Sequence, residues 1–152
     1  MNDENQKLQD LSSEQWASLL DLINTHKANS IEALSAKTGN TSWIFDVKAS
    51  NHMIGSLENL NDLKEISACP IGLPNGSHVL ATNEGSIKLD ENLVLSNVLY
   101  VPGLACNLIS MSQVIDETDC VAVFSKHMCA LQGRTSKTLI GAGERKDGLY
   151  YF

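Results

Sequence analysis

Short β-rich pieces separated by turn signals fill the sequence from Trp43 onward. Valine, isoleucine, threonine and aromatic residues gather in runs of four to nine residues, and glycine, asparagine, proline or aspartate separates these runs. The runs cover residues 43–47, 76–82, 85–89, 93–101, 120–125, 129–132 and 138–143. Strands this short and this often interrupted predict a small mainly β domain, either a barrel or a sandwich.

The clearest turn signal is Asn75-Gly76, which lies between two of the apolar stretches. Asparagine and glycine both tolerate the left-handed backbone conformation that a two-residue hairpin turn requires. A hairpin with a two-residue turn is therefore predicted at this point of the domain.

Two amphipathic helices are predicted. The first spans about residues 13–27, where Ser12 and Gln15 form a capping box and apolar residues recur at helical spacing. The second is short and begins near Ser110, and its inward-facing residues are expected to be Met111, Val114 and Ile115. We therefore expect residues 1–42 to form a polar tail, one helix and a linker, and residues 43–152 to form the β domain.

The charge of the chain limits the function classes. Lys and Arg total 11 against 18 Asp and Glu, which gives a net charge of -7. Without a basic surface, direct binding to nucleic acid is not expected. No apolar run approaches the roughly 20 residues of a membrane span, and the acidic N-terminus does not resemble a signal peptide. We expect an intracellular protein, cytoplasmic or nuclear, with no membrane partner.

The cysteines and histidines do not form a metal-binding pattern. Neither residue type occurs at the close spacing that structural zinc sites or dithiol redox sites use. We therefore expect no metal and no cofactor, and interpret the cysteines as reduced, semi-buried apolar residues. The residues concerned are Cys69, Cys106, Cys120, Cys129, His26, His52, His78 and His127.

Five blocks of the sequence resemble the protease segment of a plant copia-type retrotransposon Gag-Pol polyprotein. They occur in the order found in that family and cover the chain from about Leu11 to its last residue: "LSSEQWASLLDLINTHK", "WIFDVKASNHMIG", "LPNGSHVLATNEGSIKL", "NVLYVPGLACNLISMSQV" and "GLYYF". The resemblance implies a retropepsin-like β-barrel with a short helix after a core strand. It also implies an active site formed by two subunits, each of which contributes one aspartate.

The resemblance places the catalytic motif of the family, Asp-Ser/Thr-Gly-Ala, on Asp46, Val47, Lys48 and Ala49. Asp46 and Ala49 match this motif, whereas Val47 and Lys48 depart from it. Aspartic proteases hold two carboxylates about 3 Å apart so that the pair shares one proton. Val47 lacks the hydroxyl that stiffens the paired loops in the family, and Lys48 adds a side chain and a charge where glycine allows close approach. Two such ammonium groups would favour the doubly ionised pair, which no longer shares a proton.

Asp46 also has a simpler interpretation. An aspartate at the end of an apolar strand often stabilises a turn by accepting a backbone hydrogen bond. Ser50 lies too far along the chain to replace the missing hydroxyl, and His52 is interpreted as a hydrogen-bonded polar residue of the following turn rather than an acid or base.

Leu73, Pro74, Asn75 and Gly76 lie where the resemblance would place the flap that closes over substrate. The same four residues are equally well interpreted as an ordinary surface hairpin.

Three functions of different classes remain. The chain is either a catalytically impaired module for protein interaction or dimerisation, an active homodimeric aspartic endopeptidase that processes a polyprotein with one Asp46 from each subunit, or a remnant without activity. The substitutions at Val47 and Lys48 favour the first. A homodimer or another protein partner is expected, and a peptide substrate if the chain is active.

Overall fold

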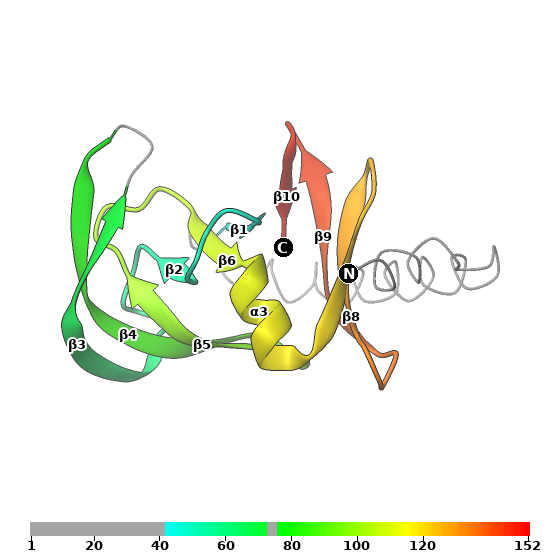
Figure 1. Cartoon of the computed structure of the whole chain (residues 1–152), viewed down its shortest axis with the longest axis horizontal. Helices are drawn as coiled ribbons and strands as arrows, with labels where there is room; N and C mark the ends of the chain where they lie inside the picture. The colour runs from blue at the N-terminus through cyan, green and yellow to red at the C-terminus, as the bar shows by residue number, and fades with distance from the viewer. Residues whose placement is uncertain (1–41, 73–75) are drawn as a thin grey trace, which may run out of the picture.

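The computed structural model describes residues 42–72 and 76–152 of the chain. The predicted N-terminal helix, its linker and residues 73–75 of the predicted hairpin lie outside the described residues. The described part is mainly β with one short helix, as the sequence predicts (Figure 1). Its strands are β1 (Trp43–Asp46), β2 (Met53–Ile54), β3 (Asn61–Gly72), β4 (His78–Asp90), β5 (Leu93–Tyr100), β6 (Asn107–Ser110), β7 (Cys120–Phe124), β8 (Met128–Gly133), β9 (Leu139–Lys146) and β10 (Leu149–Tyr151), and its helix is α3 (Met111–Thr118).

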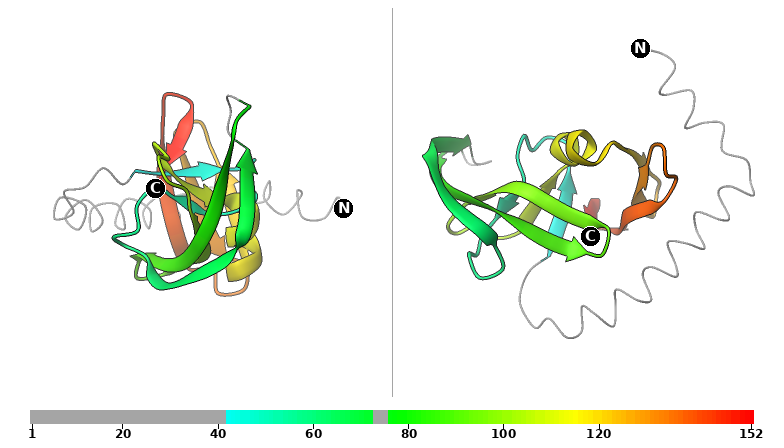
Figure 2. Two further views of the ribbon diagram at one scale, coloured as in Figure 1. Left: turned by 90° about the vertical axis from the view of Figure 1, so that its left-hand side faces the viewer. Right: turned by 90° about the horizontal axis from the view of Figure 1, so that it is seen from below.

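The strands form one curled, open sheet in the order β3-β4-β5-β2-β6-β1-β10-β9-β8-β7. Two central pairs, β1 with β6 and β2 with β5, are parallel, and the other neighbours are antiparallel. The turn end of the β4–β5 hairpin lies against β9. A Cβ added to Gly141 of β9 would lie 3.3 Å from Cδ2 of Leu93, the first residue of β5. The two further views in Figure 2 show this curling. The sheet is therefore barrel-like, with β3 and β7 as its two edges.

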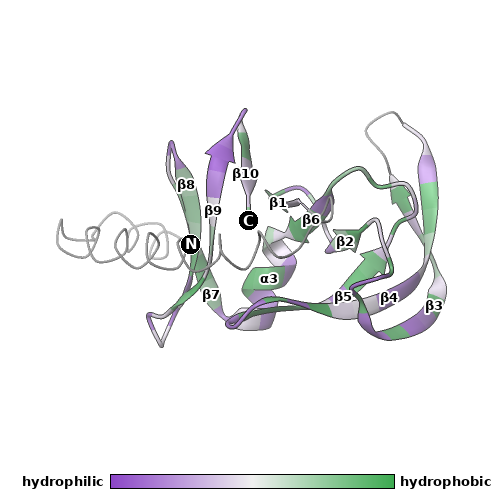
Figure 3. Ribbon diagram, turned by 180° about the vertical axis from the view of Figure 1, so that it is seen from behind, coloured by the Kyte–Doolittle hydropathy of each residue, from purple (hydrophilic) through white to green (hydrophobic). Residues whose placement is uncertain are grey.

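The two largest hydrophobic clusters of the described residues fill the interior, and β5 contributes to both. The larger cluster joins α3 to the strands on both sides of β1, and it contains Trp43, Ile109, Val114 and Leu131. The smaller cluster lies under the β3–β4 hairpin. Val98 belongs to the larger cluster and the next residue, Leu99, to the smaller one, because successive side chains of a strand point to opposite faces. Figure 3 shows the resulting alternation of apolar and polar residues along the strands.

The sequence-based strand assignment was incomplete. Residues 53–54, 61–70 and 149–151 were not predicted as strands, and residues 107–110 were expected only through the family resemblance. The predicted break before Gly85 was wrong, because β4 runs through it without interruption. A Cβ at Gly85 would lie 2.7 Å from the Asn61 carbonyl oxygen, so this glycine permits close contact with β3 rather than marking a turn.

The hairpin between β3 and β4 exists, and Gly72 pairs with His78. Residues 73–75 lie outside the described residues, so the two-residue turn at Asn75 and Gly76 stays a prediction. Gly76 does adopt the positive φ, 83°, for which glycine is suited.

Helix α3 begins where the sequence predicts. Ser110 is its N-cap residue and accepts a hydrogen bond at Oγ from the Gln113 N–H. Met111 and Val114 are buried, and Ile115 is partly buried against the larger cluster. The helix therefore covers the sheet beside β6 with the face expected from its spacing.

Candidate functional site: the Asp46 loop

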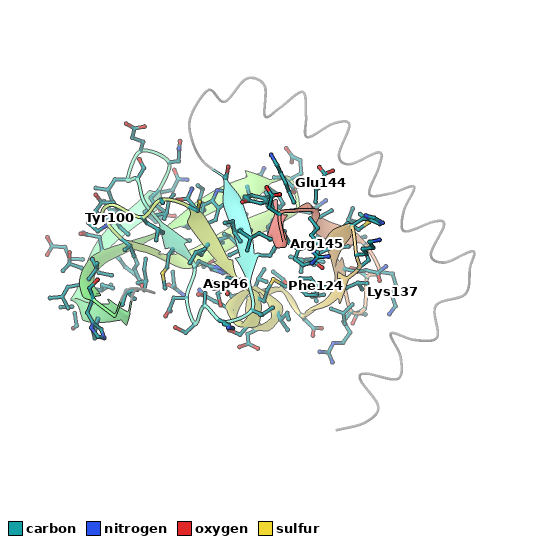
Figure 4. The ribbon with its side chains drawn as sticks, turned by 90° about the horizontal axis from the view of Figure 1, so that it is seen from above. Asp46, Tyr100, Phe124, Lys137, Glu144 and Arg145 are labelled. Atoms are coloured by element: carbon teal, nitrogen blue, oxygen red, sulfur yellow. The ribbon has the colours of Figure 1, made fainter. Side chains whose placement is uncertain are left out.

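Asp46 is the last residue of a buried central strand. Trp43, Ile44 and Phe45 of β1 are buried, whereas Asp46 is half-buried and Val47 and Lys48 are exposed. Because β1 and β6 are parallel, their carboxyl ends meet, and Asp46 pairs with Ser110. Figure 4 shows Asp46 where β1 ends beside the helix that follows β6. The sheet thus places the loop of residues 46–52 (the Asp46 loop) at the N-terminus of α3.

The Asp46 carboxylate stabilises the turn that follows it. Its Oδ1 accepts a hydrogen bond from the Lys48 backbone N–H at 2.8 Å, which is the Asx-turn arrangement. Val47, between them, is 68% exposed, the highest value among the large hydrophobic residues described. One oxygen of the Asp46 carboxylate is thus bound to the neighbouring backbone, while Val47 carries an apolar side chain into solvent.

Ser110 and Gln113 hold the Asp46 loop against α3. Ser110 Oγ donates to the Ala49 carbonyl oxygen at 2.7 Å, and the Ser110 N–H donates to His52 Nδ1 at 2.9 Å. The His52 N–H in turn donates to Gln113 Oε1 at 2.9 Å. The middle and the end of the loop are therefore both hydrogen-bonded to the first turn of the helix.

His52 is fully buried and uses both ring nitrogens. Its exposed fraction is 0%, and its Nε2 lies 3.4 Å from Glu117 Oε2. Burial lowers the pKa of His52 below its ordinary value of 6.5, and the neighbouring Glu117 carboxylate partly offsets this effect. The ring is thus a hydrogen-bonded structural group, which agrees with its interpretation as a satisfied polar residue.

The candidate flap is only partly described. Leu73, Pro74 and Asn75 lie outside the described residues, and Gly76 is exposed, with open space around its Cβ position. The hairpin that carries these residues, β3–β4, is present and forms one edge of the sheet. Its role as a flap stays a prediction.

The remaining reactive side chains do not gather near the Asp46 loop. Within residues 42–72 and 76–152, no group of three or more His, Cys, Asp or Glu is arranged to hold a metal ion. All four cysteines are free thiols. Burial raises the pKa of Cys129 to about 12 and also raises that of Cys120, so neither is suited to nucleophilic chemistry.

A family model for the β-barrel domain of Pol polyproteins matches residues 43–120. The chain belongs to this family. The match begins at the first residue of β1 and ends at the first residue of β7, so it includes the Asp46 loop and α3. The predicted origin in a retrotransposon Pol segment is thereby confirmed. No curated protein and no solved structure matches the chain.

Membership of the Pol β-barrel family agrees with the mainly β fold. Among the residues described, no helix has both the length and the apolar character needed to cross a membrane.

Sequence reasoning missed the residues that hold the Asp46 loop of this Pol β-barrel domain. Ser110 was expected only near the start of a helix, and Gln113 and Glu117 were not considered. The spacing Ser110-x-x-Gln113 is the same capping pattern that marks the predicted N-terminal helix, so the signal was present. His52, which contacts both residues of that pattern, lies 58 residues before Ser110, and the pairing of β6 with β1 and with β2 brings them together.

Proposed function

We propose that this chain is a catalytically impaired, copia-type retropepsin-like domain that binds a second copy of itself through the Asp46 loop. The observation that carries the proposal is the 68% exposure of Val47, an apolar residue directly after Asp46. In a dimer contact, this apolar side chain would leave solvent and its charged neighbours, Asp46 and Lys48, would form the polar rim. The Asp46 loop would supply the interface, and other protein partners of the same loop are the alternatives to a homodimer.

The residues around Asp46 argue against efficient proteolysis. Two aspartates act as acid and base only when rigid loops hold them within hydrogen-bond reach of one water. Asp46 Oδ1 already accepts the Lys48 N–H, and Val47 supplies no hydroxyl to link two loops across a dimer. The exposed Lys48 adds a positive charge beside each carboxylate. These features support a binding role for the inherited loop.

The sequence Asp46-Val47-Lys48 is self-complementary across a two-fold axis. If the axis passes near Val47, the two valines meet and each Asp46 faces the partner's Lys48. Such a contact has apolar residues at its centre and opposite charges at its rim, as isologous interfaces do. The substitutions that impair a protease loop therefore suit a dimer contact.

Sedimentation velocity of the full chain at increasing concentration tests the binding proposal. We expect a monomer–dimer equilibrium that Val47→Asp shifts to the monomer, because two carboxylates would replace the apolar contact. Val94→Asp is the matched control, since Val94 is 48% exposed on β5 and away from the loop. A wild-type chain that stays monomeric, or a dimer unaffected by Val47→Asp, would contradict the proposal.

The second candidate is an active aspartic endopeptidase with one Asp46 from each subunit. The hydrogen bonds that the loop makes with Ser110 and Gln113 favour it, because they preorganise the loop as catalysis requires. Incubation with a mixed peptide library from about pH 4 to pH 7 distinguishes the two functions. We expect no cleavage by the wild type and a gain of cleavage in Val47→Ser with Lys48→Gly. Wild-type cleavage that is lost in Asp46→Asn would establish the endopeptidase instead.

A further inference from the structure

The contacts between His52 and helix α3 form an exchanged capping box. In the usual capping box, the side chain of the third helical residue accepts the N–H of the N-cap residue. Here the N-cap N–H, that of Ser110, donates to His52 Nδ1, and the third residue, Gln113, accepts the His52 N–H. Each partner therefore satisfies a backbone donor of the other, and the end of the Asp46 loop becomes part of the cap of α3.

The tautomer of His52 follows from these contacts. A nitrogen that accepts a backbone N–H carries no proton, so Nδ1 is the unprotonated nitrogen of the neutral ring. The proton of the neutral ring is then on Nε2, which faces the carboxylate oxygen of Glu117 at 3.4 Å. A second proton has only Nδ1 to occupy, and there it would point at the Ser110 N–H.

We propose that His52 positions the Asp46 loop on helix α3 and that protonation of its Nδ1 releases the loop. The imidazolium would place two donors against each other at Ser110, because an imidazolium ring has no acceptor nitrogen. The hydrogen bond that joins the end of the loop to the helix cap is then lost. The bond from Ser110 Oγ to the Ala49 carbonyl would remain, so the end of the loop is released while its middle stays attached.

The groups around the ring set the pH at which release occurs. Helix α3 contributes the Glu117 carboxylate, which favours the charged ring, and the uncharged Gln113 side chain. Strand β5 contributes the Leu99 N–H, which donates to the His52 carbonyl oxygen at 2.9 Å, and β6 contributes the Ser110 N–H. Burial outweighs the carboxylate, so the pKa of His52 is lowered and release requires a pH below 6.5.

This inference does not depend on the proposed function. It concerns the attachment of the loop, which holds Val47 and Asp46 whether the loop binds a second chain or cleaves a peptide. If dimerisation through Val47 fails, the pH response of a monomer still tests the role of His52.

Nuclear magnetic resonance of the ¹⁵N-labelled full chain between pH 7.5 and pH 4.5 tests the inference. At pH 7.5, we expect the His52 ring to carry its proton on Nε2. As the pH falls, the amide signals of Ser110 and of residues 47–51 should shift or broaden at the same midpoint as the His52 ring. A ring protonated on Nδ1 at pH 7.5, or loop signals that stay fixed while His52 titrates, would overturn the proposal.

Three variants test whether protonation of His52, rather than another pH-dependent change in the protein, releases the Asp46 loop. His52→Asn keeps an acceptor near the Nδ1 position but cannot be protonated, so the loop should stay attached and its pH transition should disappear. Glu117→Gln keeps an acceptor for Nε2 and removes the negative charge, so the midpoint should move to lower pH. Asp46→Asn is the control for the Asp46 carboxylate of the loop. The pH transition of the loop signals in this variant should match that of the wild type.

Each variant also has an outcome that contradicts the inference. An unchanged midpoint in Glu117→Gln would show that the transition is not that of His52. Disappearance of the transition in Asp46→Asn would assign it to the Asp46 carboxylate. Because Glu117 is 23% exposed at its side chain, its replacement provides a test even if His52→Asn does not fold.

Discussion

Ser110 connects the loop, the strand and the helix from a single buried position. Its exposed fraction is 0%, and its hydroxyl donates to the Ala49 carbonyl while accepting the Gln113 N–H. Its own N–H donates to His52. The attachment of the Asp46 loop therefore depends on one hydroxyl more than on any charged group of the loop.

Ser110→Ala should lower the free energy of unfolding by about 1–3 kcal/mol, because it removes a helix cap and leaves the Ala49 carbonyl without its donor. Urea unfolding followed by circular dichroism measures this change. Ser96→Ala is the matched control, since Ser96 is exposed and its carbonyl, not its side chain, accepts the Gln113 amide. Equal effects of the two variants would show that the Ser110 hydroxyl has no special role.

The burial of neutral His52 should make stability fall at acidic pH. Above pH 6.5 the ring is neutral in the folded and unfolded states, so it adds no pH dependence. Below 6.5 the unfolded chain takes up a proton that the folded chain does not, because the folded pKa is lowered. The free energy of unfolding then falls by at most about 1.4 kcal/mol per pH unit until the folded pKa is reached. Unfolding curves of wild type and His52→Asn should differ by this slope, and parallel pH profiles would exclude the effect.

At the residue scale, the sequence predicted the position and character of single residues better than the contacts between them. The position of Asp46 at a strand end and the hydrogen-bonded, polar character of His52 were predicted from local pattern and from the resemblance. The partners of His52 could not be predicted, because they depend on how β1 and β2 pair with β6, and local propensity does not determine that register.

At the scale of the elements, a glycine of β9 allows the central strands to pack. A Cβ at Gly143 would lie 2.5 Å from the Tyr151 carbonyl oxygen and 2.7 Å from Phe45 Cε2. Strands β9, β10 and β1 can therefore approach closely only if this position has no side chain.

Gly143→Ala should lower the free energy of unfolding by about 1–3 kcal/mol, since backbone and a buried ring would have to move. Gly72→Ala is the control, because its Cβ would meet nothing closer than His78 Nε2 at 3.9 Å. The control should change stability by no more than about 0.5 kcal/mol. Chemical denaturation of both variants measures the difference. If Gly143→Ala is as stable as the wild type, β1 and β10 can shift without a loss in the free energy of unfolding.

The elements that the sequence missed are short, exposed or interrupted. Strands β2 and β10 have too few residues for a periodic pattern, and the exposed strand β3 has polar or charged residues at five of its first seven positions and a proline further along. Pairing with neighbours holds these segments extended. By contrast, β5, β7, β8 and α3 carry a clear apolar pattern, and their positions were predicted.

At the scale of the whole molecule, the two edges of the sheet differ in chemistry. Strand β3 carries Asp62, Lys64, Glu65 and Pro70, which discourage further pairing, whereas β7 is Cys-Val-Ala-Val-Phe without charge or proline. Residues 42–119 contain ten acidic residues and three lysines, whereas residues 120–152 contain five basic and two acidic residues. The apolar edge strand, β7, therefore lies in the basic segment of residues 120–152, whereas the rest of the chain is acidic.

Val123→Lys on β7 should reduce aggregation at high protein concentration, because a charged residue blocks edge-to-edge pairing. Light scattering during slow heating measures the effect. Leu63→Lys is the control on the other edge, where Leu63 is 48% exposed between charged neighbours. Similar scattering by wild type and Val123→Lys would show that β7 is not the edge that aggregates.

The position of β1 in the sheet has a consequence for the synthesis of the protein. Ile44 pairs with Leu108 on one side and with Tyr151 on the other, so the second neighbour of the central strand comes more than a hundred residues later in the chain. A ribosome must translate residues 149–151 and release them from its exit tunnel before this strand is paired on both sides. Until then, the apolar residues of β1 are available to chaperones, and folding is tied to completion of the whole barrel rather than to its first half.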